Sequence, residues 1–213
     1  MKHENAQPEA GQFFEDLWRR GDPWALETSA YEDHRYRRLF DCLADRHYEK
    51  VLEIGCGAGA LTRRLAARAT SICALDVSET AINQARAIPF ASAAAIDYRV
   101  ADVMQYDVAS DGPFDLIVMT ETVYYLGWLH SFFEVGWLAH QLFEATREGG
   151  RLLLSNTLSA SADYLMRPWL IRTYHDLIAN TGFHVEMEDA YTDHKDDTEF
   201  EVLTSRFCKR RMS

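Results

Sequence analysis

Residues 51–59 decide the fold, and they read Val51-Leu52-Glu53-Ile54-Gly55-Cys56-Gly57-Ala58-Gly59. A short apolar strand runs here into a loop with glycine at every second position, and a helical pattern follows from Leu61. Glycine lacks a Cβ, so its backbone can approach a ligand closely and adopt conformations that other residues resist. In open α/β folds the ligand lies beyond the carboxyl ends of the strands. We therefore expect Gly55 and Gly57 to line a ligand site.

Strand-like and helix-like patterns alternate after this loop. The expected strands are 51–54, 71–76, 96–103, 114–119, 151–155, 183–189 and 200–208. The expected helices are 61–67, 79–87, 130–147 and 163–180, the third being ended by Gly149-Gly150. This order predicts a doubly wound, Rossmann-like α/β fold. It would have a mainly parallel seven-stranded sheet with helices on both faces and an antiparallel C-terminal hairpin.

Length and composition favour one globular domain. The chain has 213 residues, of which 47% are hydrophobic and 26% are charged, which is ordinary for a protein with a buried core. Within residues 1–48, positions 12–47 hold two helical patterns separated by the turn Gly21-Asp22-Pro23. We expect them to form a helical N-terminal lid of the same domain, and residues 49–213 to form the ligand-binding part with the sheet.

Charge and hydropathy narrow the classes of partner. The formal net charge of −11 disfavours nucleic acid and anionic membranes, because both repel an acidic surface. No apolar run approaches the ~20 residues that a membrane helix needs, and residues 1–11 lack the apolar core of a signal peptide. The cysteines show no CxxC pair and the histidines no metal-ligand spacing. We expect a cytoplasmic protein with reduced thiols and no metal site.

Two classes of nucleoside ligand fit the glycine loop. Gly55-x-Gly57-x-x-Ala60 also satisfies the relaxed dinucleotide fingerprint, and Asp76 lies near the distance expected for its ribose acid. Three features favour a methyl donor instead. Glu53 interrupts an otherwise apolar strand, and Asp102 is expected to end the third strand with a carboxylate for an adenine amino group. The sheet also closes with a hairpin in place of a second mononucleotide-binding half.

This order of acids and glycines resembles the class I S-adenosylmethionine-dependent methyltransferases over about residues 50–210. The resemblance implies an enzyme with S-adenosyl-L-methionine as methyl donor and S-adenosyl-L-homocysteine as its product. It also implies that the glycine loop contacts the methionine part, that Asp76 binds the ribose hydroxyls and that Asp102 holds adenine. Val77 and Val103, next to the two acids, are expected to flank the adenine ring, with plain core packing as the alternative.

A narrower resemblance involves residues 21–24, 31–36 and 120–126. These segments are similar to the nodulation protein S family, whose members N-methylate a deacetylated chitooligosaccharide. The similarity implies a small-molecule acceptor methylated on nitrogen or oxygen, with an amino sugar or another natural-product-like amine favoured. Two alternatives stay open, namely methylation of a protein or nucleic acid and a binding module that holds the donor without transferring methyl groups.

Residues of the lid are candidates to bind the charged groups of the donor. Arg35 is expected to pair with the donor carboxylate in forked geometry, and Trp24 or Tyr31 to shelter the sulfonium with a ring face. The alternative places Arg35 in a surface ion-pair set with Glu32 and Asp33, and makes Trp24 an anchor of the lid.

Glu121 is expected to end the fourth strand at the rim of the site. There its carboxylate would lie beside the donor and orient an amine acceptor or take its proton; alternatively it bonds only to nearby backbone amides. Tyr124 or Tyr125 is expected to line the acceptor pocket while the other packs inward. The catalytic candidates are therefore Glu121 and Tyr124, and His34 and His175 are weaker candidates for a base.

Large apolar side chains recur at helical spacing after this region. They are Phe132, Phe133, Trp137, Leu138, Leu142 and Phe143. The spacing is typical of a helix face packed against the core, and an exposed remainder would serve contact between two copies. The sequence is compatible with a monomer or a homodimer.

Overall fold

The computed structural model describes residues 10–159, 164–195 and 198–210. Its strands are β1 (Tyr48–Ile54), β2 (Ala69–Asp76), β3 (Ala95–Val100), β4 (Phe114–Thr120), β5 (Thr146–Leu158), β6 (His184–Lys195) and β7 (Thr198–Cys208). Its helices are α1 (Ala10–Trp18), α2 (Ala30–Cys42), α3 (Ala60–Leu65), α4 (Glu79–Ala87), α5 (Val108–Asp111), α6 (Val123–Leu129), α7 (Phe132–Ala145) and α8 (Pro168–Asn180), with a 3-10 turn, η1, at Ala66–Arg68.

The strands form one seven-stranded sheet in the order β3-β2-β1-β4-β5-β7-β6. Strands β1 to β5 pair in parallel, and β7 runs antiparallel to both β5 and β6. The predicted fold class is confirmed. Successive strands are added on one side of β1 up to β3 and on its other side from β4 onward, so the strand order switches between β1 and β4. Folds of this class bind ligands at the carboxyl ends of the strands beside such a switch point.

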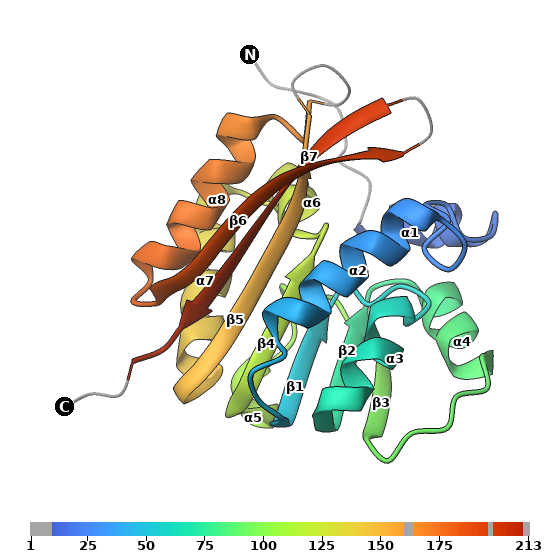
Figure 1. The fold of residues 1–213 in the computed structure, drawn as a ribbon, viewed down its shortest axis with the longest axis horizontal. Helices are drawn as coiled ribbons and strands as arrows, with labels where there is room; N and C mark the ends of the chain where they lie inside the picture. The colour runs from blue at the N-terminus through green and yellow to red at the C-terminus, as the bar shows by residue number, and fades with distance from the viewer. Residues whose placement is uncertain (1–9, 160–163, 196–197, 211–213) are drawn as a thin grey trace.

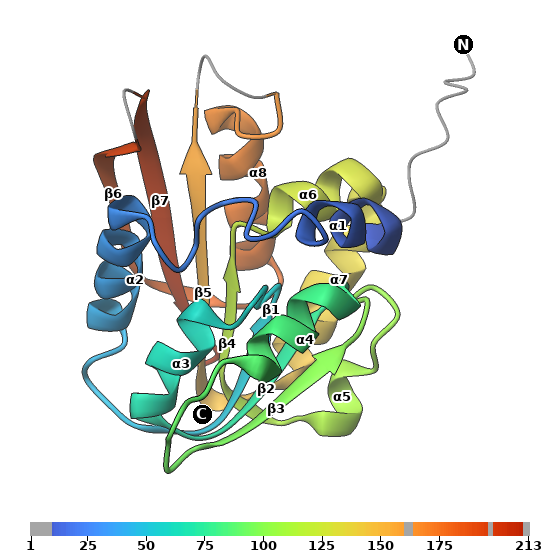
Figure 2. The ribbon, with the colours of Figure 1, turned by 90° about the vertical axis from the view of Figure 1, so that its right-hand side faces the viewer.

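Helices cover both faces of the sheet (Figure 1, Figure 2). Val51 of β1 points into the core cluster that contains Leu39 of α2. Its neighbour Leu52 points into the opposite cluster, with Leu138 of α7 and Ile178 of α8. Side chains alternate along a strand, so a parallel strand that is covered on both faces is apolar at almost every position. Within residues 51–54, the buried end of β1, Glu53 is the one exception.

Several predicted boundaries are wrong. Strand β3 ends at Val100, so Asp102 lies in the loop after it. The helix expected over 130–147 is α7 at Phe132–Ala145, because Ser131 is extended and begins it with a capping box to Glu134, and the separate helix α6 before it was not predicted. Gly149-Gly150 ends no helix, since β5 starts at Thr146 and runs through both glycines. The helix expected over 163–180 begins at Pro168, and residue 163 lies outside the described residues.

The apolar stripe on α7 is divided between core and surface. The buried face of the helix is built from Val135, Leu138, Ala139 and Leu142, spaced so that they share one side. Phe132, Phe133 and Trp137 point away from it and are 50%, 87% and 63% exposed. The prediction of a core face is therefore wrong for these three, because α7 meets the sheet along a narrower strip than its apolar stripe.

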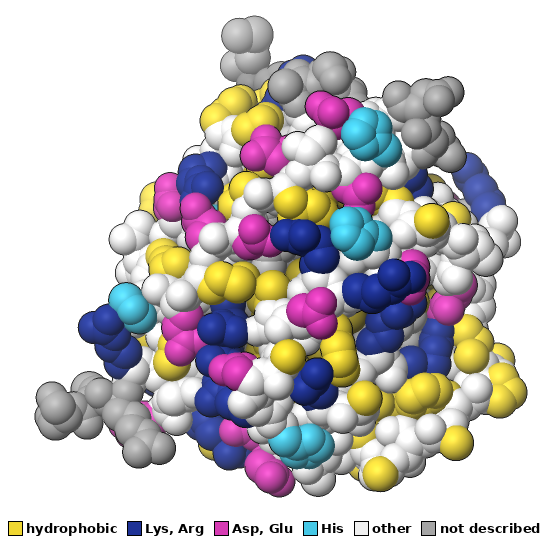
Figure 3. Space-filling view, in the orientation of Figure 1, with side chains coloured by type: hydrophobic (Ala, Val, Ile, Leu, Met, Phe, Trp, Pro, Cys, Tyr) yellow, Lys and Arg dark blue, Asp and Glu magenta, His cyan; other side chains and the backbone are white. Residues whose placement is uncertain are grey.

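The surface mixes charges of both signs. In Figure 3, Lys and Arg side chains are interspersed with Asp and Glu on the face formed by α2 and α3. Ion pairs across this face include Arg64 with Asp33 at 2.8 Å and Arg38 with Asp189 at 2.6 Å. Within the part of the chain that the structure describes, we find no helix of the length and apolarity required to span a membrane.

Candidate functional site

A cavity of about 390 Å³ lies at the carboxyl ends of β1, β2 and β4, and residues of α1 and α2 line its lid side. Its wall contains all the residues that the sequence predicted to bind the donor, and both main catalytic candidates. They are Trp24, Tyr31, Arg35, Glu53, Gly55, Gly57, Asp76, Val77, Asp102, Val103, Glu121 and Tyr124. The fold thus brings the lid, the glycine loop and the ends of four strands or their following loops to one place.

The glycine loop is shaped by left-handed backbone and held by Asp76. Gly57 has a φ of +54°, and a Cβ on it would lie 2.8 Å from the ring of Trp18. Oδ2 of Asp76 accepts a hydrogen bond from the N–H of Gly57 at 2.8 Å, and Oδ1 accepts one from the N–H of Ser78 at 2.9 Å. Burial raises the pKa of the Asp76 carboxyl, and these N–H groups oppose the rise. The acid at the end of β2 is therefore locked to the loop at the end of β1.

Glu53 is a buried carboxyl group within β1, only 3% exposed. Its Oε2 has no hydrogen-bond partner among the residues that the structure describes, and burial raises its pKa to about 8. A buried carboxyl without a partner is costly until a cation or hydrogen-bond donor compensates it. Because Glu53 lines the cavity, it can meet such a group on a ligand.

Asp102 reaches the cavity from the loop after β3 and not from a strand end. Its Oδ1 accepts a hydrogen bond from the N–H of Met104 at 2.9 Å, and its Oδ2 accepts one from the Gln105 side chain at 3.2 Å. Val103 packs in the main hydrophobic core cluster and also lines the wall of the cavity. Val77 lines the wall beside Asp76.

Arg35 of α2 is buried between two carboxylates. Its Nε and Nη2 donate to Oε2 of Glu32 at 3.0 and 2.6 Å, and its Nη1 donates to Oε1 of Glu121 at 3.3 Å. The alternative of a surface ion-pair set with Glu32 and Asp33 is wrong about the location, since Arg35 is 2% exposed. Of the two acids in that alternative, Glu32 does pair with Arg35, whereas Asp33 pairs with Arg64.

Glu121 follows β4 with a φ of +53°, a left-handed conformation that is uncommon outside glycine. Its Oε1 accepts hydrogen bonds from the N–H and the hydroxyl of Thr157 at 2.8 and 3.0 Å. Its Oε2 accepts one from the hydroxyl of Tyr124 at 2.9 Å. Burial raises the pKa of the Glu121 carboxyl, and Arg35 opposes that rise. The alternative in which Glu121 bonds only to backbone amides is therefore wrong, because three side chains bond to it.

Aromatic side chains form much of the remaining wall. The hydroxyls of Tyr31 and Thr157 are 3.1 Å apart, and burial raises the pKa of Tyr31 to about 12. The rings of Tyr124 and Tyr125 lie 4.6 Å apart, and both line the cavity. Tyr124, 6% exposed, also belongs to a buried core cluster, so the expected inward packing occurs in a residue that lines the cavity as well. Trp24 contacts Trp18 edge-to-face at 5.8 Å, which anchors the lid as well as lining the cavity.

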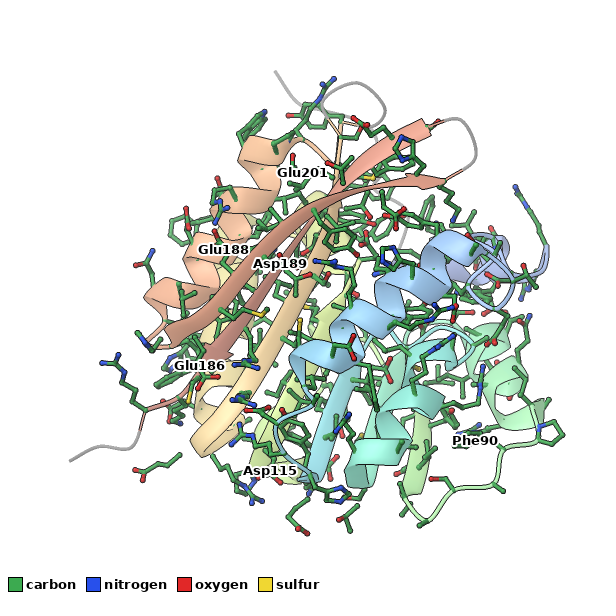
Figure 4. The ribbon with its side chains drawn as sticks, viewed as in Figure 1. Phe90, Asp115, Glu186, Glu188, Asp189 and Glu201 are labelled. Carbon is green, nitrogen blue, oxygen red and sulfur yellow. The ribbon has the colours of Figure 1, made fainter. Side chains whose placement is uncertain are left out.

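The lid helix α2 is fastened to the C-terminal hairpin of β6 and β7. Alternate residues of β6 contact the lid, namely Asp189, Tyr191, Asp193 and Lys195. Arg38 of α2 donates to Asp189 at 2.6 Å and lies 3.9 Å over the ring of Tyr191. Figure 4 labels Asp189 on β6, the strand beside α2. Since strand side chains alternate, one side of β6 becomes a wall against the lid.

The sequence did not single out several residues that also line the cavity. They include Phe14 and Trp18 of α1, Thr122, Thr157 of β5, and Lys195 and Phe200 of the hairpin. Glu32 also lines the cavity; the sequence named it only as a surface partner of Arg35, three positions away on a helix and within reach of a side-chain pair. Lys195 and Phe200 carried no usable signal, since their arrival at the cavity depends on the length and twist of the hairpin.

The two histidines considered as bases are not part of the cavity wall. His175 is 1% exposed, its ring nitrogens contact Ser205 and Asn156, and burial lowers its pKa to about 3. His34 lies 2.6 Å from Asp193 at the lid–hairpin contact. Across residues 10–159, 164–195 and 198–210 there is no group of three or more His, Cys, Asp or Glu side chains that could hold a metal ion.

Comparisons with known proteins bear on this site. The family model for Nodulation protein S (NodS) matches residues 6–135. Nodulation protein S of Rhizobium tropici is 33% identical over 141 residues, which is 66% of this chain and 57% of that protein. A ubiquinone biosynthesis O-methyltransferase of Thiobacillus denitrificans is 31% identical over 114 residues, which is 53% of this chain and 49% of that protein. The chain thus spans about half the length of the curated relatives it matches.

A solved structure extends the likeness over nearly the whole fold. The N-methyltransferase NodS from Bradyrhizobium japonicum WM9, in complex with S-adenosyl-L-homocysteine, matches with a TM-score of 0.76 and 24% identity. The match covers 94% of this chain and 98% of that one, and it shows a shared fold. The residues matched by the family model include the lid, the glycine loop and Glu121. The chain therefore belongs to the nodulation protein S family.

Proposed function

We propose that this protein is an S-adenosylmethionine-dependent methyltransferase that acts on an amine nitrogen of a small molecule. The observation that carries the proposal is the convergence of Glu53, Asp76, Asp102, Arg35 and the glycine loop around one cavity. Family membership supports it, and the related structure from Bradyrhizobium japonicum is that of an N-methyltransferase with S-adenosyl-L-homocysteine.

The cavity has the groups that such a donor needs. The free Oε2 of Glu53 matches a cationic amino group, and the carboxylate of Asp76 matches two ribose hydroxyls. A Cβ on Gly55 would lie 2.5 Å from the hydroxyl oxygen of Thr122, so this stretch of loop has no room for a side chain. Asp102 would hold adenine, with Val77 and Val103 beside the ring in the same wall.

The lid would complete the donor site. The guanidinium of Arg35 presents Nη1 toward Glu121 at the cavity wall, where it can also bond a donor carboxylate. Tyr31 and Trp24 would shelter the sulfonium with their rings, because an aromatic face attracts a cation. Closing the lid over the donor would also exclude water from the reacting atoms.

Transfer requires an acceptor with a free lone pair. The bound donor supplies a methyl group on a sulfonium, which is already a good leaving group. The acceptor nitrogen would form a bond to the methyl carbon as the carbon–sulfur bond breaks and its electron pair stays on sulfur. An amine is protonated near neutral pH, so Glu121 would orient the amine and receive its proton. Tyr124, bonded to Glu121 at 2.9 Å, would hold that carboxylate in place.

The charges beside the acceptor favour nitrogen. Glu121 lines the cavity, and a carboxylate stabilises an ammonium group far better than it stabilises a neutral hydroxyl. An amino sugar is the specific acceptor suggested by the family, and methylation of oxygen is the competing outcome. The net charge of −11 argues against a polyanionic acceptor such as nucleic acid.

Calorimetric titration with S-adenosyl-L-homocysteine, followed by turnover assays on a library of amines and phenols, tests the proposal. We expect saturable binding, its loss in Asp76→Ala, and methyl transfer to amines. No binding at millimolar ligand would overturn the donor assignment. Binding without turnover of any amine or phenol would favour a non-catalytic module, and transfer to phenols alone would make the protein an O-methyltransferase. Saturable methylation of bulk RNA or a peptide would overturn the small-molecule acceptor.

A further inference from the structure

Five polar side chains form a continuous chain along the cavity. Nζ of Lys195 donates to Oε1 of Glu32 at 3.2 Å, and Oε2 of Glu32 accepts from Arg35 at 2.6 and 3.0 Å. Arg35 then donates to Glu121 at 3.3 Å, and Glu121 accepts from Tyr124 at 2.9 Å. All five residues line the cavity. The first four side chains of this hydrogen-bonded series alternate in charge, and the series connects the C-terminal hairpin, the lid and the end of β4.

The two edges of the Arg35 guanidinium are held differently. Glu32, which is 5% exposed, binds the Nε and Nη2 edge through a short charge-assisted contact of 2.6 Å. Nη1 has a longer contact of 3.3 Å, to an oxygen of Glu121 that already accepts two hydrogen bonds from Thr157. One edge of Arg35 is thus clamped, while the other is weakly bonded and can be shared with a ligand.

Lys195, from the C-terminal hairpin, holds the carboxylate of Glu32 that binds Arg35. Its Nζ also donates to the backbone carbonyl of Trp24 at 2.7 Å and lies 5.7 Å from the ring centre of Tyr31. With Lys195 in place, two cations balance the carboxylates of Glu32 and Glu121. Removing one cation would leave a buried carboxylate uncompensated, and Glu32 would no longer be held at its second oxygen.

We infer that Glu32 is a positioning residue for the methyl donor. It clamps one edge of Arg35 so that Nη1 is presented to the donor carboxylate, and Lys195 couples this clamp to the C-terminal hairpin. The inference rests on the proposed function, since it needs a donor that carries a carboxylate. Glu32 acts through Arg35, so its effect depends on whether the ligand has that carboxylate.

Two ligands separate this role from a merely structural one. S-Adenosyl-L-homocysteine carries the carboxylate, whereas 5′-methylthioadenosine keeps the adenosine and the thioether but lacks it. We expect Glu32→Gln to raise the Kd for S-adenosyl-L-homocysteine about tenfold and to leave that for 5′-methylthioadenosine within about twofold. Glu32→Asp, which keeps the charge, should recover part of the loss. Lys195→Met should change the same ratio by about threefold in the same direction.

Asp33→Asn is the matched control, because Asp33 is the neighbouring acid on α2 and pairs with Arg64 away from the cavity. Equal losses for both ligands in Glu32→Gln, or no loss for either, would overturn the inference. If Glu32→Gln does not fold, Lys195→Met decides by the same ratio, since its side chain is 27% exposed. Failure of the unchanged protein to bind S-adenosyl-L-homocysteine would overturn the proposed function first, before any variant is compared.

Discussion

The hydroxyl of Tyr124 donates to Oε2 of Glu121 at 2.9 Å, while Thr157 occupies the other oxygen of the same carboxylate. Tyr124 lies three residues after Glu121, in the first turn of α6, and Thr157 comes from the neighbouring strand β5. The left-handed φ of +53° at Glu121 turns the chain sharply between β4 and α6. An acid and the groups that orient it are thereby placed together at the cavity wall.

Replacing Glu121 with Gln should reduce turnover far more than donor binding. Gln keeps the shape and one acceptor oxygen but cannot take a proton, so we expect kcat to fall by about 10²-fold or more. The Kd for S-adenosyl-L-homocysteine should change by less than about threefold, or ~0.6 kcal/mol. Tyr124→Phe should lower kcat less, because it removes a positioning hydroxyl and keeps the acid. Steady-state kinetics and calorimetry measure both quantities, and a loss of donor affinity with unchanged kcat would show that Glu121 does not serve the acceptor.

Replacing Asp76 with Ala should abolish donor binding in the accessible concentration range. The change removes the proposed ribose contacts and also releases the N–H of Gly57, which Asp76 binds at 2.8 Å. We expect the Kd for S-adenosyl-L-homocysteine to rise about a hundredfold or more. Asp97→Ala on β3 is the control, since Asp97 is exposed and bonds to Arg99. Retention of near-normal affinity in Asp76→Ala would remove this acid from the donor site.

Glu53 should make the stability of the protein depend on pH. Its pKa of about 8 lies above the ordinary value of 4.5, so between these values the folded state keeps a proton that the unfolded chain has released. The free energy of unfolding therefore falls as pH rises through this window, by up to about 1.4 kcal/mol per pH unit. Urea denaturation should show Glu53→Gln gaining stability relative to the unchanged protein between about pH 5 and about pH 8. A constant difference over that range would contradict the prediction.

The ionisation of Glu53 should also change when the donor's amino group binds beside it. A cation bound beside Glu53 favours its ionised form, so binding below about pH 8 should release a proton. Calorimetry with S-adenosyl-L-homocysteine in buffers of different ionisation enthalpy measures this proton directly. We expect the buffer dependence near neutral pH to disappear in Glu53→Gln. Equal proton release in both proteins would place the amino group away from Glu53.

Two positions on α7 should respond to truncation in opposite ways. Leu138 is 2% exposed, so Leu138→Ala should lower the free energy of unfolding by about 2–5 kcal/mol through lost burial and a cavity. Phe133 is 87% exposed, so Phe133→Ser should change it by less than about 0.5 kcal/mol. Chemical denaturation of both variants checks the pair. A large loss in Phe133→Ser would mean that this ring is covered in solution.

The sequence by itself determined the parallel α/β class, the glycine loop and the positions of the predicted donor residues in the cavity wall. These depend on patterns that span a few residues, such as glycines after an apolar strand or an acid near a strand end. Parallel strands place their carboxyl ends at one edge, so locally predicted residues meet there without knowledge of the strand order. Asp102 still arrives although β3 is shorter than expected, because the loop after the strand returns to that edge.

Only the tertiary structure decided which side chains pair with one another along the lid side of the cavity. Lys195 meets Glu32 across 163 positions of the chain, and Thr157 meets Glu121 across 36. Contacts of this kind depend on the length of β6, the twist of the hairpin and the packing of the lid, none of which leaves a local pattern. The same holds for the stripe on α7, because the width of the buried strip is set by what the helix packs against. Local spacing therefore predicts which residues reach the strand edge, while long-range packing selects their partners.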